Sequence, residues 1–249
     1  MSPPAGAFLA LWNSISEARL QREYELWHAF EHVPERVSLP GFLCATRYRS
    51  LDHASGPPLY FTCYRLQDLQ ALDSPGYRQV FAAPTPWTAR MRGELTRFLR
   101  LPCRLEGAHG LSSSGRLALL HLRGSGDEAA ARIDAELAQR VARGTLVAAH
   151  WGRYSETSAI PIANRQVAGE RPQPGRDLVL MLQDMEAVPL RACAAGLVDA
   201  LVDCAPAVRP PELFELQTEV WRAALPAHRA GRLAPRTDLF EMFTRGETR

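Results

Sequence analysis

Residues 41–48 read GFLCATRY, and residues 144–151 read GTLVAAHW. Both segments begin with glycine, have leucine third and alanine fifth, and end with a basic residue before an aromatic one. A second pair of similar segments is LQDLQA at 66–71 and LQDMEA at 182–187. Matches this short also arise by chance, but these lie at equivalent places in two similar series of elements. We therefore interpret the chain as an internal duplication.

The first half shows four strand-like segments and two helical ones. Apolar or alternating runs predict strands at 8–15, 41–49, 59–66 and 98–106. Helical patterns cover 17–36 and, irregularly, the stretch from Asp68 to about Leu95. The order is β-α-β-β-α-β, which is the ferredoxin-like unit.

The second half repeats this order. Strands are predicted at 116–124, 145–154, 177–183 and 211–221, and helices at 127–143 and 188–204. Asp127 is a candidate N-cap of the first of these helices, and Gly144 is its expected stop. Asp68 and Asp184 follow equivalent strands, where each can cap the next helix.

These patterns predict an α+β protein made of two tandem ferredoxin-like units. Each unit has helices on one sheet face only, so the two bare faces can pack sheet to sheet within one chain. The predicted divisions are 1–110, 111–224 and a C-terminal arm at 225–249, with a short helix at 238–243.

Composition excludes several classes of protein. The chain has 249 residues and no lysine, so it cannot form a lysine Schiff base with substrate or pyridoxal phosphate. The arginines are scattered among acids, and no strand carries the basic-Gly-aromatic run of an RNA-binding sheet, so no nucleic acid is expected. The five cysteines form no CxxC pair, and there is no signal peptide or membrane-spanning run. We expect a cytoplasmic protein with reduced thiols.

Residues 27–42, WHAFEHVPERVSLPGF, hold the candidate chemistry. On a helical wheel Glu31 falls within an apolar arc, while His28 and His32 fall at its rim. Pro34 is expected to end or kink this helix. The other members of the arc are Leu20, Glu23, Tyr24, Leu26, Trp27, Phe30 and Val33.

One hypothesis is a metal site, because two histidines spaced i,i+4 share a helix face. However, the glutamate of HAFEH directly precedes the second histidine, so the segment is not the HExxH motif of zinc proteases. A third ligand would have to come from elsewhere, and nothing singles out any of the candidates His53, His109, His121 and His150. We predict no metal.

The other hypothesis is an acid/base site, with His32 as general acid or base and Glu31 or a tyrosine orienting it. Arg47 could hold an anionic oxygen. Alternation places Tyr60 and Tyr64 on one face of their strand and Phe61 and Cys63 on the other. Aromatic walls with arginine and histidine suit a planar acidic or phenolic ligand, although such aromatics are more often core. The candidate ligand-binding residues are Trp27, His28, Arg47, Tyr48, Tyr60, Tyr64 and Trp87.

The stretch resembles the dimeric α/β barrel superfamily and, within it, the EthD-like proteins. The resemblance covers residues 6–107 and rests on His32, Pro34, Pro40-Gly41 and the pair Arg47-Tyr48. Near 136–143 the second half has neither the histidine nor the proline, which implies a single site. The fold implied is a tandem ferredoxin-like chain forming an intramolecular dimeric α/β barrel.

The resemblance implies a small-molecule ligand but does not choose a reaction. One hypothesis is a cofactor-independent enzyme of the monooxygenase, cyclase or isomerase type acting on a small aromatic or polyketide-like acid. The alternatives are a non-catalytic binding or accessory protein and a haem- or metal-dependent enzyme. The internal duplication removes the usual need for a homodimer, yet leaves further dimerisation open.

Overall fold

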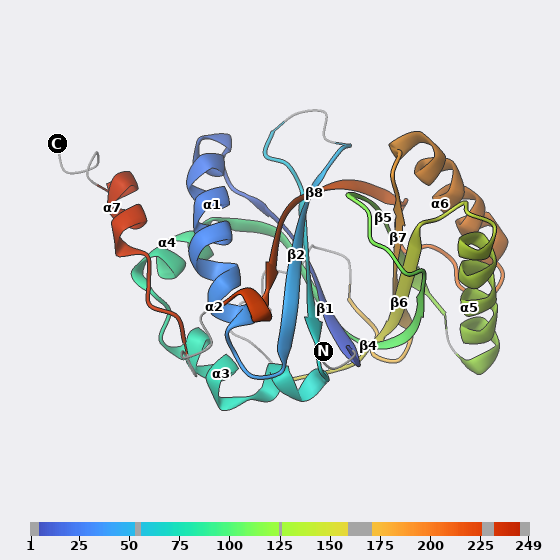
Figure 1. Ribbon diagram of the computed structural model, residues 1–249, viewed down its shortest axis with the longest axis horizontal. Helices are drawn as coiled ribbons and strands as arrows, with labels where there is room; N and C mark the ends of the chain where they lie inside the picture. Colours follow the sequence, from blue (N-terminus) through green and yellow to red (C-terminus); the bar gives the residue numbers. More distant parts are fainter. Residues whose placement is uncertain (1–4, 53–55, 125, 159–170, 226–231, 245–249) are drawn as a thin grey trace.

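Eight strands form one closed antiparallel barrel (Figure 1). The computed structural model describes residues 5–52, 56–124, 126–158, 171–225 and 232–244. The strands are β1 (Ala7–Ile15), β2 (Phe42–Ser50), β3 (Tyr60–Leu66), β4 (Leu95–His109), β5 (Arg116–Arg123), β6 (Ala148–Tyr154), β7 (Asp177–Asp184) and β8 (Glu212–Trp221). Their order around the barrel is β1-β3-β2-β8-β5-β7-β6-β4.

This order confirms two ferredoxin-like sheets in one chain. The first contributes β4-β1-β3-β2 and the second β8-β5-β7-β6. The sheets join at both edges, where β2 pairs with β8 and β4 with β6. Each half therefore covers the exposed edge strands of the other, which removes the unpaired backbone groups that invite aggregation. The predicted fold class is correct.

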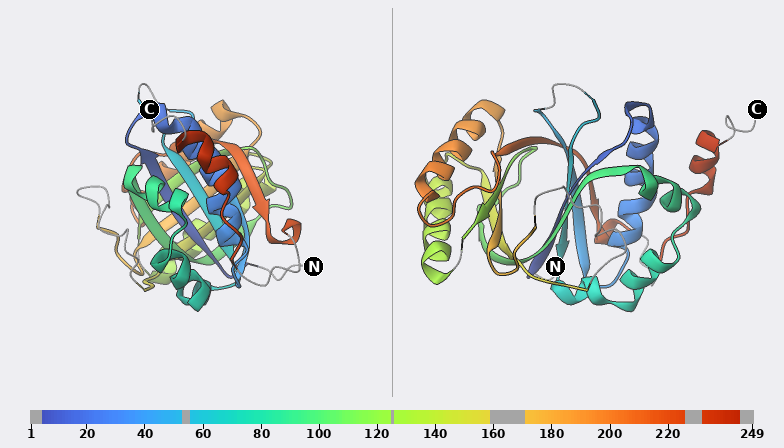
Figure 2. Two further views of the ribbon diagram at one scale, coloured as in Figure 1. Left: turned by 90° about the vertical axis from the view of Figure 1, so that its left-hand side faces the viewer. Right: turned by 180° about the vertical axis from the view of Figure 1, so that it is seen from behind.

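The helices of the described segments pack on the outer faces of the two sheets, on opposite sides of the barrel in the right-hand view of Figure 2. The first half carries η1 (Ala18–Leu20), α1 (Gln21–Trp27), η2 (His28–His32), α2 (Val33–Val37), η3 (Leu69–Asp73), α3 (Pro75–Ala82) and α4 (Pro86–Glu94). The second half carries α5 (Gly126–Ala142) and α6 (Ala187–Leu201). After β8 come η5 (Arg222–Ala224) and, in the C-terminal arm, α7 (Thr237–Thr244). No helix among the described segments is both long and apolar enough to cross a membrane.

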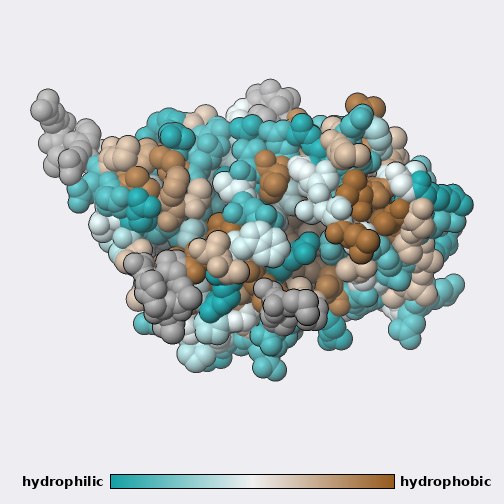
Figure 3. All heavy atoms as spheres, in the orientation of Figure 1, coloured by the Kyte–Doolittle hydropathy of each residue, from teal (hydrophilic) through white to brown (hydrophobic). Residues whose placement is uncertain are grey.

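The core has separate layers inside and outside the barrel. Phe8, Trp12, Phe61 and Phe214 belong to the interior cluster, which draws on strands of both halves. One outer layer packs β5–β7 against α5 and α6, and two others pack the first sheet against its helices. Hydrophilic side chains cover most of the face in Figure 3, with a hydrophobic group over the second half near α6.

The segment HAFEH forms a π-helical turn, η2, and the helix then continues to Val37. The prediction that Pro34 ends the helix was wrong. The Val33 backbone N–H bonds to the His28 carbonyl, five residues back, so the widened turn accommodates the proline ring that a regular α-helix would reject. The helical wheel also placed two residues wrongly. Phe30, predicted in the apolar arc, is 51% exposed, and His28, predicted at the rim, is buried.

The two matched segments enter their strands through glycines of left-handed conformation but then differ in register. Gly41 has φ 83° and Gly144 has φ 71°. Beyond them, Arg47 faces the helices, whereas the aligned His150 lines a cavity with Phe8 of the barrel interior. A bulge between Phe42 and Cys44 in the β2–β3 pairing adds one residue to β2 before Arg47, whereas β6 pairs with β7 without a bulge, and this one-residue difference exchanges the two sheet faces.

Alanine substitutions at these two glycines form a matched pair. A Cβ on Gly41 would lie 2.6 Å from the Ala71 Cβ, whereas one on Gly144 would meet nothing within 4 Å. Both variants carry the strain of a positive φ, which costs about 1 kcal/mol, and Gly41→Ala adds a steric clash of about 1–3 kcal/mol. Chemical denaturation should therefore show the larger loss of unfolding free energy for Gly41→Ala. Equal losses would contradict the close approach.

The four predicted helix ends have mixed outcomes. Asp68 caps η3 by accepting a hydrogen bond of 2.8 Å from the Gln70 backbone N–H. Asp184 instead accepts from the Met185 N–H, and the N-cap of α6 is Glu186. Asp127 lies inside the first turn of α5, which begins at Gly126, so it is not the N-cap. The helix ends before Gly144, as predicted.

The C-terminal arm returns to the first half. The predicted helix at 238–243 is α7, and it packs beside α1 and α4. Phe240 stacks on Trp87 with ring centroids 6.0 Å apart, and Phe243 lies at the same distance. The arm thus covers the helices of the first half from outside (Figures 1 and 2).

Candidate functional site

A small cavity lies between the outer face of the first sheet and its helices. Its volume is about 40 Å³, enough for a few water-sized groups. The sheet supplies outward-facing residues of β1 to β4, and the helices supply residues of α1, η2, α2, α3 and α4. The lining residues are Leu9, Leu11, Asn13, Tyr24, Trp27, His28, His32, Arg36, Phe42, Tyr64, Tyr77, Phe81, Arg92, Leu95 and Phe98.

Both histidines of the π-helical turn line this cavity. Their ring centroids are 5.3 Å apart, and the His32 ring lies 4.3 Å from that of Trp27. His28 Nε2 is 3.4 Å from the Thr62 hydroxyl, but the Nδ1 atoms of both histidines are buried without a hydrogen-bond partner among the described residues. Burial holds the pKa of both histidines well below the usual range. The positive charges of Arg47 and Arg36 add to this effect for His28, and that of Arg36 adds to it for His32. Both imidazoles are therefore neutral at pH 7.

Two arginines also line the cavity, and sequence reasoning missed them. Arg36 pairs through Nη1 with Glu35, while its Nη2 is buried and has no partner in the part of the chain that the structure describes. Arg92 donates to the carbonyls of Val80 and Phe81 at 2.9 and 3.1 Å, at the C-terminal end of α3. Burial and, to a smaller extent, the positive charge of Arg36 lower the pKa of Arg92 to about 10. The Arg92 guanidinium therefore stays charged at pH 7.

Arg47 lies behind this wall and is buried. Its guanidinium carbon sits 4.1 Å from the Tyr60 ring centroid and 4.9 Å from that of Tyr24. Its Nε and Nη2 atoms have no hydrogen-bond partner in the described part of the chain. A buried cation between aromatic faces raises the local positive potential. Arg47 thus adds charge to the site without lining the cavity.

Glu31 does not orient His32 through any contact in the described structure. Its Oε1 accepts from the Thr85 hydroxyl at 2.5 Å, and its Oε2 accepts from the Arg236 backbone N–H at 2.7 Å. Glu31 therefore joins η2 to the start of α4 and to the C-terminal arm. The wheel was right that this carboxylate is buried.

The remaining candidates separate into three positions. Trp27 and Tyr64 line the cavity, and burial raises the pKa of the Tyr64 hydroxyl. Tyr60 lies on the same sheet face, as predicted, but its hydroxyl donates to Glu25 at 3.0 Å, outside the cavity lining. Tyr48 faces the barrel interior with Phe61 and Cys63, so the structure does not bring it to this site.

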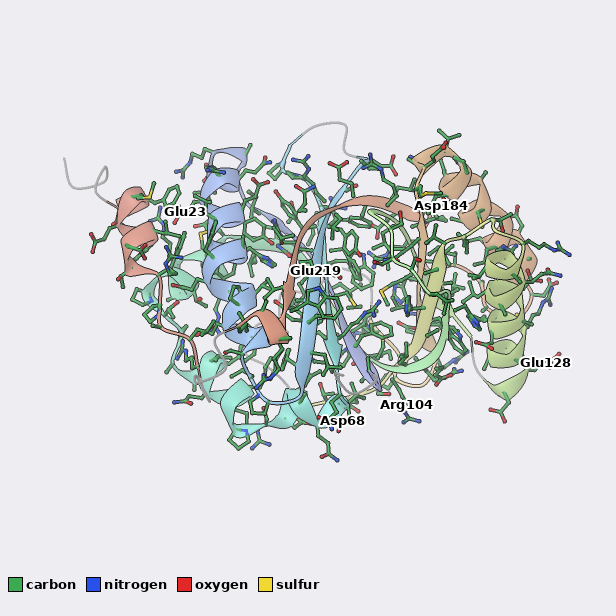
Figure 4. All side chains as sticks on the ribbon, in the orientation of Figure 1. Glu23, Asp68, Arg104, Glu128, Asp184 and Glu219 are labelled. Carbon is green, nitrogen blue, oxygen red and sulfur yellow. The ribbon has the colours of Figure 1, made fainter. Side chains whose placement is uncertain are left out.

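Trp87 is buried outside the cavity, beneath α7. Its indole N–H donates to Glu23 Oε1 at 3.1 Å, and the same oxygen accepts from Arg90 Nε at 3.0 Å. Figure 4 shows Glu23 on α1, on the side that faces α4 and α7. The sequence could not place Trp87 because its aromatic partners lie in the arm.

No group of three or more His, Cys, Asp or Glu side chains in the described ranges is arranged to hold a metal ion. His109 bonds to Asp134, His121 bonds to Asp177, and His150 lies beside Arg65, all away from η2. His53 lies outside the described residues. The cavity at His28 and His32 is smaller than any drug-sized ligand, whether a haem or a substituted aromatic ring.

The fold matches solved structures, with low sequence identity. An anthrone oxidase-like protein has a TM-score of 0.60 and 10% identity over 94% of this chain and 99% of that one. A candidate monooxygenase from Fusobacterium nucleatum subsp. nucleatum has a TM-score of 0.51 and 7% identity over 87% and 95%. A mutant chlorite dismutase from Candidatus Nitrospira defluvii has a TM-score of 0.50 and 11% identity over 86% and 93%.

These likenesses show the dimeric α/β barrel fold, which the sequence predicted. No protein-family model matches the chain. No curated protein matches it either. The finer resemblance to EthD-like proteins therefore stays a prediction.

Proposed function

We propose that this protein is a cofactor-independent enzyme of the monooxygenase, cyclase or isomerase type. Its substrate would be a small aromatic or polyketide-like acid, and His32 would be the general acid/base. The observation that carries the proposal is the group of unpartnered polar atoms around one apolar cavity: His28 Nδ1, His32 Nδ1 and Arg36 Nη2. Buried polar atoms are nearly always hydrogen-bonded, so three of them together suit a polar ligand.

The charges suit proton abstraction from an acidic C–H or O–H group. A neutral His32 can accept the proton, which would then reside on its imidazole. The electron pair left on the substrate forms a phenolate or enolate, and Arg36 can stabilise its oxygen with the N–H that lacks a protein partner. Arg92 and the more distant Arg47 add positive potential in a largely apolar environment, where electrostatic attraction is strong.

One anionic intermediate serves all three reaction classes. An enolate or phenolate can reduce O₂ in an oxygenation, attack a carbonyl in a cyclisation, or regain a proton at another carbon in an isomerisation. Two of the similar structures are described as an anthrone oxidase-like protein and a candidate monooxygenase, which favours the oxygenation. A sequence identity of 7–10% is evidence for the fold alone, so the electrostatics of the cavity are the main support for the proposed function.

The substrate must enlarge the cavity in order to bind. A volume of about 40 Å³ is too small for an aromatic ring with its substituents. The cavity walls include α3 and α4, which cover the outer face of the first sheet. We therefore expect these helices to move outward on binding, and the enlarged cavity to close around the ligand.

The direct test is a cofactor-free assay on a panel of anthrone, phenolic acids and polyketide-like acids. Oxygen uptake and product absorbance should detect turnover by the purified protein without added flavin, haem or metal. The matched control is His32→Gln, which should show none. Ligand-dependent rises in melting temperature without turnover on any panel member would instead favour the non-catalytic binding protein.

The pH profile gives a second expectation. Because the neutral imidazole is the active form and its pKa is lowered, kcat/KM should stay level from pH 7 to below 6.5 and fall only as the pH passes the lowered pKa. In Arg36→Met the largest charge effect on His32 is gone, so the acid limb should move up toward 6.5. An acid limb that is at 6.5 in both proteins would contradict the role of His32.

A further inference from the structure

A second cavity lies inside the barrel, at one of its mouths. Its volume is about 190 Å³, several times that of the cavity at His32. The start of β1, the end of β3 and part of β4 line it from the first half, and β6 and β7 line it from the second. Neither half forms it alone. Figure 1 shows the start of β1 beside β4 at the lower centre of the molecule.

Arg65 and His150 are the charged or titratable groups of its lining. Arg65 pairs in register with Phe8 of the interior core, and residues paired in this way project to the same sheet face. Arg65 Nη2 lies 3.4 Å from His150 Nε2. The rest of the lining is apolar, and includes Ala7, Phe8, Leu105 and Met181.

The charge of Arg65 is not balanced within the described ranges. Its guanidinium makes no ion pair there, and His150 supplies no negative charge. Burial lowers the pKa of His150 to about 4, assisted by Arg65 and His109, so the imidazole is neutral at pH 7. A partly buried arginine without an acidic partner is costly to retain unless a counter-ion binds it.

We infer that this barrel-mouth cavity binds a small monocarboxylate with an apolar body. The planar guanidinium of Arg65 matches a carboxylate and can donate two parallel hydrogen bonds to it. The neutral His150 adds a hydrogen-bonding group, and Phe8, Leu105 and Met181 offer contacts to a hydrocarbon chain or ring. One cation suits a monoanion better than a phosphate dianion, which would need more donors.

This site is separate from the one proposed for catalysis. His32 and Arg36 lie between the sheet and the helices, whereas Arg65 and His150 lie inside the barrel. Because strands of both halves surround the ligand, binding should also hold the two sheets together. The ligand would therefore stabilise the folded barrel without entering the catalytic cavity.

Isothermal titration calorimetry with straight-chain carboxylates from acetate to octanoate, and with the matching alcohols, tests this inference. We expect affinity to peak at an intermediate chain length and the alcohols to bind much more weakly. Arg65→Met should weaken carboxylate binding about 10- to 100-fold, because a hydrogen bond to a charged group is lost. The control Arg104→Met alters an exposed arginine near the same mouth and should bind within a factor of two of the unmodified protein (Figure 4).

Arg36→Met separates the two cavities. If the carboxylates bind at the barrel mouth, this variant keeps their affinity while Arg65→Met loses it. No binding to the unmodified protein, equal binding to Arg65→Met, or a loss confined to Arg36→Met would each overturn the inference. Unchanged near-ultraviolet circular dichroism of Arg65→Met will show that the variant folds. Arg65→Lys keeps the positive charge but not the planar guanidinium, so it should bind the carboxylates with intermediate affinity.

Discussion

Replacing His32 with glutamine should lower turnover by about 10²- to 10⁴-fold, the usual contribution of a general acid/base. Glutamine keeps a polar side chain of similar length but cannot accept a proton at neutral pH. His32 makes no protein hydrogen bond through Nδ1, so its replacement breaks no such bond there. The melting temperature should therefore change little, and turnover kinetics beside thermal denaturation will separate the two effects.

His28→Gln is the matched control, because this residue lines the same cavity and its Nδ1 also lacks a partner. His28 contacts the Thr62 hydroxyl, so its substitution should disturb positioning more than proton transfer. We expect a smaller loss in kcat than for His32→Gln. Full activity in His32→Gln would show that His32 is not the general acid/base.

Replacing Glu35 with glutamine should cause the largest loss of stability among the substitutions considered. Glu35 is 1% exposed and pairs with Arg36, which is 3% exposed, and also with Arg232 of the arm. Without this carboxylate, Arg36 would be a buried charge with no acidic partner. Such a change costs about 3–5 kcal/mol of unfolding free energy, which should lower the melting temperature by about 6–20 °C in a chain of this size.

Two controls assign the source of this loss. Arg232→Gln removes the contact of the arm with Glu35 but leaves the pair of Glu35 with Arg36. Glu17→Gln removes an exposed carboxylate that pairs with Arg19, and it should leave the melting temperature unchanged. If Glu35→Gln loses no more stability than Arg232→Gln, the buried pair does not stabilise the site as argued.

The barrel was predictable because its evidence is spread over the whole chain. Strand-like segments recur in the same order in both halves, and Gly41 and Gly144 enter equivalent strands with the same left-handed backbone. Aligning the two segments could not predict that Arg47 faces the helices while His150 faces the barrel interior. The bulge between Phe42 and Cys44 exchanges the faces of the β2 residues that follow it, and a short sequence match does not reveal where such a bulge lies.

The candidate site was predictable where it depends on local spacing. His28 and His32 share a helix face, and the same spacing extended by one turn would have found Arg36. Glu31 and Trp87 could not be placed, because their partners Arg236 and Phe240 belong to an arm about 150–200 residues away in the chain. Pattern analysis sees neighbours along the helix and not the segments that return to cover it.

The central claim is that a neutral His32 and the free N–H of Arg36 meet an acidic aromatic ligand in one cavity. Long-range ¹H–¹⁵N spectra of the histidine rings at pH 7 test it most directly, in a titration with the aromatic acid that stabilises the protein most. We predict a neutral His32 ring in the free protein, a change in its nitrogen shifts on binding, and the loss of that change in Arg36→Met. A protonated His32 in the free protein, or unchanged shifts at saturating ligand, would contradict the account.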